Sequence, residues 1–185
     1  MKILLHICCG PCAIYPVQLL REEGFEVEGF FYNPNIHPYC EYKKRYETVI
    51  AASEHLGLNI IHHRYDFENF LREISSFSSR EEQHRFCWRI RLEETAKVAK
   101  TKGIANFTTT LLSSPYQDIK EIVRLGEEIA QRNGLHFISM NFRKGFAQSH
   151  RISKEWRLYH QNYCGCLYSE KESIEKRQRT EDRNS

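Results

Sequence analysis

The chain has 185 residues, of which 41% are hydrophobic, and a formal net charge of +3. This length suffices for one domain with its own hydrophobic core, so folding does not depend on disulfides. No apolar stretch approaches the length that spans a bilayer, which argues against a membrane protein; we expect an unexported, cytoplasmic monomer. The small net charge makes the overall field a weak argument for a nucleic-acid partner.

Short apolar runs alternate with longer stretches of helical period. This alternation predicts a single α/β domain whose mostly parallel, Rossmann-like (HUP-like) sheet is flanked by helices. The expected strands, in chain order, are residues 3–7, 25–32, 59–62, 106–110 and 136–140. The expected helices carry apolar stripes of Tyr15, Leu19 and Leu20 before Gly24; Tyr42, Tyr46, Val49, Ile50 and Leu56 before Gly57; and Trp88, Leu92, Ala96 and Ala99 before Gly103.

Three segments between and after these elements carry further predictions. Residues 67–80 are expected to be irregular. Ser114 predicts the start of another helix, as an N-cap with Pro115 in the first turn and Gln117 completing a capping box. That helix is expected to end at Asn133 and Gly134. Residues 169–185 are nearly all charged or polar, so we expect a domain of residues 1–168 followed by a flexible charged tail, 169–185.

Seven cysteines fall in separate stretches, the first being Cys8-Cys9-Gly10-Pro11-Cys12 at the end of the first strand. In a reducing compartment, clustered cysteines indicate metal ligands or redox groups more than structural disulfides. Neighbouring strand residues point to opposite faces, so Cys8 and Cys9 share a site only if the backbone leaves strand geometry, which Gly10 and Pro11 favour. The alternative is that these thiols are simply buried in the core.

Two further stretches bring additional candidate ligands. Cys164 and Cys166, separated by one glycine, can chelate one metal, close a strained disulfide, or form half of a structural zinc site. His84 and Cys87 are spaced to lie on one helical face, as ligands of one metal or as ordinary helix residues. Cys40 has no cysteine partner nearby and is interpreted as incidental.

The candidate ligands number seven, too many for one tetrahedral zinc or one iron–sulfur cluster. They are Cys8, Cys9, Cys12, His84, Cys87, Cys164 and Cys166. Seven ligands suit a cluster with a neighbouring metal, or a cluster with a redox-active cysteine pair. Basic residues crowd the same stretches, which fits a polyanionic substrate, the negative charge of thiolate-bound metal, or solvated helix faces. They are Arg85, Arg89, Arg91, Arg143, Lys144, Arg151, Lys154 and Arg157.

Taken in their order along the chain, the motifs of residues 3–169 resemble those of the QueH-type epoxyqueuosine reductases. The resemblance rests on Leu5 to Cys12; Phe31 to Pro38 with Glu41, Tyr42 and Arg45; Cys87-Trp88 with Arg91-Leu92 and Thr95-Ala96; Phe107 to Leu112 with Ser114 to Gln117; Phe142-Arg143; and Tyr159, Gln161 and Tyr163 to Cys166. The chain departs from the family in two places. His84-Arg85-Phe86-Cys87 stands where a Cys-x-x-Cys pair is usual, and His160 stands where arginine is typical.

The resemblance implies two-electron reduction of the epoxide of epoxyqueuosine in a tRNA anticodon, giving an alkene and water. It also implies a 4Fe-4S cluster beside a second, mononuclear iron. By the same resemblance Cys8, Cys9 and Cys87 fall on cluster-ligand positions, while Cys12, Cys164 and Cys166 fall on positions of the second metal or of redox-active, catalytic thiols. His84 is the expected fourth cluster ligand, since histidine can replace cysteine in iron–sulfur ligation. The expected partners are tRNA and an unidentified electron donor.

Residues that follow the second and fourth strands leave the same sheet edge as Cys8, where open α/β sheets bind ligands. The expected substrate contacts are Tyr32, Asn33, Asn35, His37, Thr109, Thr110, Ser114, Tyr116 and Gln117, with Arg45 and Arg143 contacting phosphate. Turn and capping roles are the alternative for several of them. Two other functions stay open: another iron–sulfur, sulfur-handling enzyme of tRNA modification, and a zinc-stabilised, non-enzymatic RNA-binding module. Cysteines replace the glycine-rich phosphate loop of ATP-pyrophosphatase-like domains, which argues against ATP.

Overall fold

A computed structural model describes residues 1–184, with residues 181–184 described by their backbone alone. Five parallel strands form one sheet in the order β3-β2-β1-β4-β5. The strands are β1 (Lys2–His6), β2 (Glu26–Phe31), β3 (Ile60–His62), β4 (Asn106–Thr109) and β5 (His136–Phe137). The predicted parallel α/β fold is confirmed. The last two strands are shorter than expected. A 3-10 turn begins at Thr110 and ends β4 there, and the chain has no regular structure at residues 138–141, after β5.

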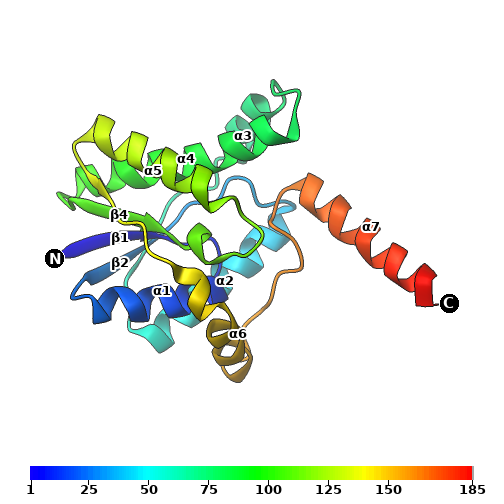
Figure 1. The fold of residues 1–185 in the computed structure, drawn as a ribbon, viewed down its shortest axis with the longest axis horizontal. Coiled ribbons are helices and arrows are strands. Elements are labelled where there is room, and N and C mark those ends of the chain that lie inside the picture. The colour runs from blue at the N-terminus through cyan, green and yellow to red at the C-terminus, as the bar shows by residue number, and fades with distance from the viewer. Residues whose placement is uncertain (185) are drawn as a thin grey trace.

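Helices cover both faces of the sheet (Figure 1). One face carries α1 (Gly10–Glu22), which packs against α2 (Tyr39–Leu56) and α6 (Phe146–Glu155). The other carries α4 (Arg80–Thr101) packed against α5 (Ile119–Asn133). The β1 residues Ile3, Leu4 and Leu5 are fully buried between these layers. A strand with both faces covered consists of consecutive apolar residues, which explains the first run of the sequence.

Two local predictions were wrong. Residues 67–80 contain a helix, α3 (Phe67–Ile74), which buries Phe70 and Ile74; its single amphipathic stripe was too short to stand out. The helix expected from Ser114 begins instead after Asp118, whose carboxylate accepts a hydrogen bond from the Glu121 backbone N–H at 3.2 Å. Ser114 caps only a turn, accepting from the Tyr116 N–H.

The C-terminal segment is helical, as α7 (Leu167–Asn184), and Figure 1 shows it projecting from the domain. The composition predicted a flexible charged tail over residues 169–185. A helix this polar is supported by pairs such as Lys171 and Glu175, one turn apart, whose charges lie 3.7 Å from each other. Ser185 lies outside the described residues, and the division into a domain and a flexible tail stays a prediction. No helix in the described part of the chain has the length and hydropathy needed to cross a bilayer.

Gly10 brings α1 and α2 into backbone contact beside the first cysteines. A Cβ at this position would lie 2.6 Å from the Thr48 carbonyl oxygen. We expect Gly10→Ala to lower the free energy of unfolding by about 1–3 kcal/mol, because α1 must shift away from α2. Alanine's higher helix propensity, about 1 kcal/mol, acts in the opposite direction. Urea denaturation measures the sum, and a stabilised variant would contradict the close contact.

Candidate metal centre

Three cysteines gather where β1 ends. The sulfur atoms of Cys8, Cys9 and Cys12 all lie within 4.8 Å of one another. The chain bends at Cys8 and starts α1 directly after Cys9, so it leaves strand geometry between β1 and α1. The predicted departure from the strand is confirmed. Three thiols this close form a donor set for a soft metal or for part of an iron–sulfur cluster.

The thiols of this triad influence one another strongly. Hydrogen bonds from Cys12 and Cys9 hold the pKa of Cys8 well below its usual range. Burial raises the pKa of Cys9, and hydrogen bonding to Cys8 raises that of Cys12. The Cys8 sulfur therefore carries a negative charge most easily. The Cys9 and Cys12 thiols lose their protons when a metal cation binds to their sulfurs.

Two polar side chains reach the sulfurs from other elements. The Thr110 hydroxyl, just after β4, lies 3.2 Å from the Cys8 sulfur. The amide Nε2 of Gln161 lies 3.0 Å from the Cys9 sulfur and 4.0 Å from that of Cys12. Gln161 was not predicted as a site residue, although its place two residues after Tyr159 was part of the resemblance.

The remaining candidate cysteines lie around the triad. Gln117 Nε2 lies 3.6 Å from the Cys164 sulfur, and the Ser169 hydroxyl lies 3.4 Å from that of Cys166. Burial raises the pKa of Cys87 to about 12, opposed by Arg91 and increased by the charges of the other two thiols. Three cysteine-bearing stretches of the chain, residues 8–12, 87 and 164–166, are thus close enough for their charges to interact. Within the described residues these three cysteines do not join the group whose sulfurs lie within 4.8 Å.

Among the described residues, His84 and Cys40 do not belong to the group of three close sulfurs. Burial lowers the pKa of His84, whose ring centroid lies 5.8 Å from that of Trp88. Ligation by His84 stays a prediction. Cys40 is exposed on the first turn of α2.

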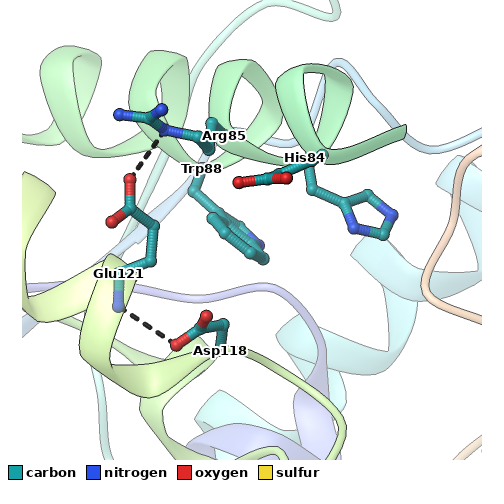
Figure 2. A pocket seen from close by; sticks show the side chains of 6 residues that line it. His84, Arg85, Trp88, Asp118 and Glu121 are labelled. Atoms are coloured by element: carbon teal, nitrogen blue, oxygen red, sulfur yellow. Dashed lines mark hydrogen bonds and ion pairs between the residues drawn. The ribbon is translucent and has the colours of Figure 1, made fainter. Parts of the chain in front are cut away.

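A cavity of about 450 Å³ opens between the start of α4 and the start of α5. It is lined by Glu81, His84, Arg85, Trp88, Asp118 and Glu121. Figure 2 shows the Trp88 ring between His84 on one side and the Arg85–Glu121 ion pair on the other. The Trp88 indole N–H donates to the Gln117 side chain at 2.7 Å, and Gln117 in turn approaches Cys164. One side chain, Gln117, therefore connects Trp88 in the cavity wall with the Cys164 sulfur.

Arg45 is buried and holds the loop that carries Cys164. Its guanidinium donates to Glu41 at 2.7 Å and to the backbone oxygens of Cys164 and Tyr163 at 2.9 Å each. The Tyr159 hydroxyl donates to the other carboxylate oxygen of Glu41 at 2.7 Å. A side chain 2% exposed, with each guanidinium nitrogen hydrogen-bonded within the protein, does not reach a phosphate. The expected phosphate contact at Arg45 is replaced by this positioning role.

The other expected substrate contacts divide between structural and accessible positions. Arg143 donates to the backbone oxygens of Ser114 and Gln117, so it shapes the turn before α5. Asn33 donates to the Ile7 carbonyl. Three more are buried, namely His37, Thr109 and Thr110, and Tyr32 and Ser114 are partly buried. Tyr116 is 89% exposed.

His6, which was not predicted as a site residue, connects the ends of β1, β2 and β4 by hydrogen bonds. Its Nδ1 lies 2.9 Å from the Thr109 hydroxyl and its Nε2 lies 3.1 Å from the Tyr32 carbonyl oxygen. Burial lowers the pKa of His6 to about 4, so the ring is neutral at physiological pH. The sequence signal was a histidine inside an apolar strand.

Some of the crowded basic residues are neutralised. Arg85 pairs with Glu121, and Arg89 pairs with Glu93 and Glu128. These two arginines therefore form ion pairs on the helix surface, in agreement with the interpretation of the basic residues as solvated helix faces.

One buried group points to a missing ligand beside the sulfurs. Asn35 is fully buried, and neither atom of its side-chain amide has a hydrogen-bond partner within the described residues. A Cβ built on Gly165, between Cys164 and Cys166, would lie 3.3 Å from the Asn35 nitrogen. Buried amides without partners are rare. The thiol set and this amide fit a bound metal group with an oxygen or sulfur atom near Asn35.

Comparison with known proteins identifies relatives over nearly the whole chain. A family model described as epoxyqueuosine reductase QueH matches residues 3–172. An epoxyqueuosine reductase QueH of Thermotoga maritima is 36% identical over 182 residues, covering 94% of this chain and 93% of the relative. Another of the same description, from Dehalococcoides mccartyi, is 35% identical and covers 95% of this chain and 96% of that one.

A solved structure shares the fold. It is the predicted subunit of a tRNA methyltransferase from Methanocaldococcus jannaschii, with a TM-score of 0.56 over 84% of this chain and 76% of the other. At 12% sequence identity, this likeness bears on the fold alone.

Proposed function

Because the chain belongs to the epoxyqueuosine reductase QueH family, we propose that Cys8, Cys9 and Cys12 form the core of its metal centre. The protein is an oxidoreductase of tRNA modification that reduces epoxyqueuosine to queuosine in the anticodon. The observation that carries the proposal is the mutual approach of three sulfurs within 4.8 Å at the end of β1. Ligands of open α/β sheets bind at this edge.

The proposed centre is a 4Fe-4S cluster with a second iron beside it. Cys8, Cys9, Cys87 and His84 are the proposed cluster ligands, and Cys12, Cys164 and Cys166 hold or flank the second iron. Bound iron would supply a Lewis acid for the epoxide oxygen and a path for electrons. In this proposal Thr110 and Gln161 hydrogen-bond the sulfurs and orient them.

The reaction breaks both C–O bonds of the epoxide. Two electrons and two protons convert the oxygen to water and leave a carbon–carbon double bond. The electrons come from an external one- or two-electron donor, and the protein works as a cytoplasmic monomer. Its own side chains bind and orient the substrate and keep water from the sulfur centre.

We propose that the substrate nucleoside reaches the centre through the cavity between α4 and α5. A reaction on an anticodon base requires that base to be turned out of its stack, and an aromatic ring commonly receives such a base. Tyr116, which is 89% exposed, offers such a ring, and the Trp88–Gln117 hydrogen bond leads from the cavity to Cys164. Tyr116 and Gln117 are the proposed aromatic and polar contacts.

The deciding experiment uses protein purified without oxygen. This protein should be brown and contain iron and acid-labile sulfide. With a chemical reductant it should convert epoxyqueuosine-containing tRNA to queuosine tRNA, as measured by nucleoside analysis. A colourless protein with stoichiometric zinc would refute the iron–sulfur centre. Fully loaded protein that forms no queuosine would refute the activity.

His84 is tested separately, with Cys and Ala replacements. A ligand role predicts that His84→Cys lowers the reduction potential of the cluster, since histidine ligation raises it, and that His84→Ala lowers the iron content. Electronic spectra and a redox titration measure both effects. If neither variant differs from wild type, His84 is a cavity residue alone.

A further inference from the structure

Arg91 is the largest fully buried side chain in the described part of the protein. It lies one turn after Cys87 on α4 and is 1% exposed. Guanidinium groups keep their charge inside proteins, so this residue brings a permanent positive charge to the edge of the sulfur site. A buried charge requires an anionic partner or extensive hydrogen bonding.

The hydrogen bonds of the Arg91 guanidinium within the described residues go to Cys87. Its Nε donates to the Cys87 carbonyl oxygen at 2.7 Å, and its Nη2 lies 3.1 Å from the Cys87 sulfur. Within residues 1–180, no carboxylate forms an ion pair with it. Arg45, the other buried arginine, differs because it has the Glu41 carboxylate at 2.7 Å.

Sulfur atoms are the groups near Arg91 that can become negative. The Cys87 sulfur lies 3.1 Å from Nη2 of Arg91, and both side chains are buried. The guanidinium is therefore in direct contact with one sulfur of the proposed centre.

We propose that Arg91 is a positioning residue that provides the fixed positive charge of the sulfur centre, balancing its thiolates and raising its reduction potential. The inference rests on the proposed metal centre. No carboxylate within residues 1–180 pairs with the Arg91 guanidinium, and metal-bound thiolates would be its anionic partners. Reduction adds negative charge to the centre, and a neighbouring cation makes that addition more favourable.

The charge explanation makes opposite predictions for the metal-free and the loaded protein. Without metal, Arg91 is a buried cation beside protonated thiols, and an apolar side chain of similar volume replaces such a group at little cost or with a gain in stability. With metal, the same replacement removes the balancing charge. A merely structural arginine predicts a loss of stability in both states.

The test compares Arg91→Met, Arg91→Lys and wild type, with Arg89→Met as the matched control. Arg89 lies on the same helix but is partly exposed and paired with Glu93 and Glu128. We expect metal-free Arg91→Met to unfold at or above the wild-type temperature. Its iron affinity, measured by chelator competition, should fall by about 10–100-fold, the usual loss for groups that orient metal ligands. Its reduction potential should become more negative.

The Lys variant, which keeps the charge but not the planar fork, should keep a potential closer to wild type than the Met variant does. The control should match wild type throughout. The inference is overturned if Arg91→Met binds iron with wild-type affinity and potential, or if its metal-free form is destabilised. Wild-type protein without iron would refute the proposed centre itself, and so the two failures are distinguishable.

Discussion

Cys9→Ser is expected to lower the affinity for iron by more than about 100-fold and to abolish epoxide reduction. Changes to groups that only orient ligands already cost about 10–100-fold, and loss of a ligand exceeds that. A serine hydroxyl stays protonated where a thiol ionises, so it does not replace the thiolate. Cys9 is 1% exposed and its sulfur lies within 4.8 Å of both other sulfurs, so the substitution removes one of three adjacent donors.

The measurement is iron and acid-labile sulfide per chain after anaerobic reconstitution, together with turnover on modified tRNA. Cys40→Ser is the control, because Cys40 is exposed and lies outside the triad. It should retain full iron content and activity. A Cys9→Ser protein that keeps its cluster would remove Cys9 from the ligand set.

Arg45→Met is expected to lower the free energy of unfolding by about 3–5 kcal/mol, because it leaves the buried Glu41 carboxylate without its partner. The two side chains are 2% and 8% exposed, and their charges are 2.7 Å apart. Replacing both, as Glu41→Gln with Arg45→Met, should recover much of this loss since no buried charge remains. Urea denaturation of the metal-free protein gives the four corners of a double-mutant cycle.

The matched control is Lys43→Met in the same helix. Lys43 and Glu47 form a pair with the same spacing, but both side chains are more than 60% exposed. Its loss should cost under about 1 kcal/mol. An Arg45→Met effect of the same size would show that the buried pair does not stabilise the protein. Beyond stability, the variant frees the Cys164 and Tyr163 carbonyls and should loosen the second cysteine loop.

The location of the site follows from the order of the strands. The direction of chain progress across the sheet reverses between β1 and β4, and ligands bind outside the carboxyl ends of strands at such a reversal. Cys8 follows β1 and Thr110 follows β4, which is why these two residues meet at 3.2 Å. The cysteines thus occupy the position where related architectures bind ligands.

Local sequence was sufficient for the features that depend on neighbouring residues. The apolar run of β1 and the helical stripe of α2 predict their elements because periodicity reflects which face is buried. Cys8, Cys9 and Cys12 lie within five consecutive residues, so the sequence alone predicted that their sulfurs lie close together. A competing cap at Asp118 displaced the predicted start of α5 at Ser114, since both segments carry similar local signals.

Residues far apart in the chain received their roles only from the folded structure. Arg45 meets the Cys164 loop across more than a hundred residues, and Gln161 reaches Cys9 across a similar separation. An arginine suits a phosphate and a buried carboxylate equally well, and only burial in the fold separates the two. Seven cysteines and their spacing indicated a metal centre, but which charges surround the sulfurs was decided by how α4 and the last loop pack around β1, because electrostatic interactions depend on distance in space.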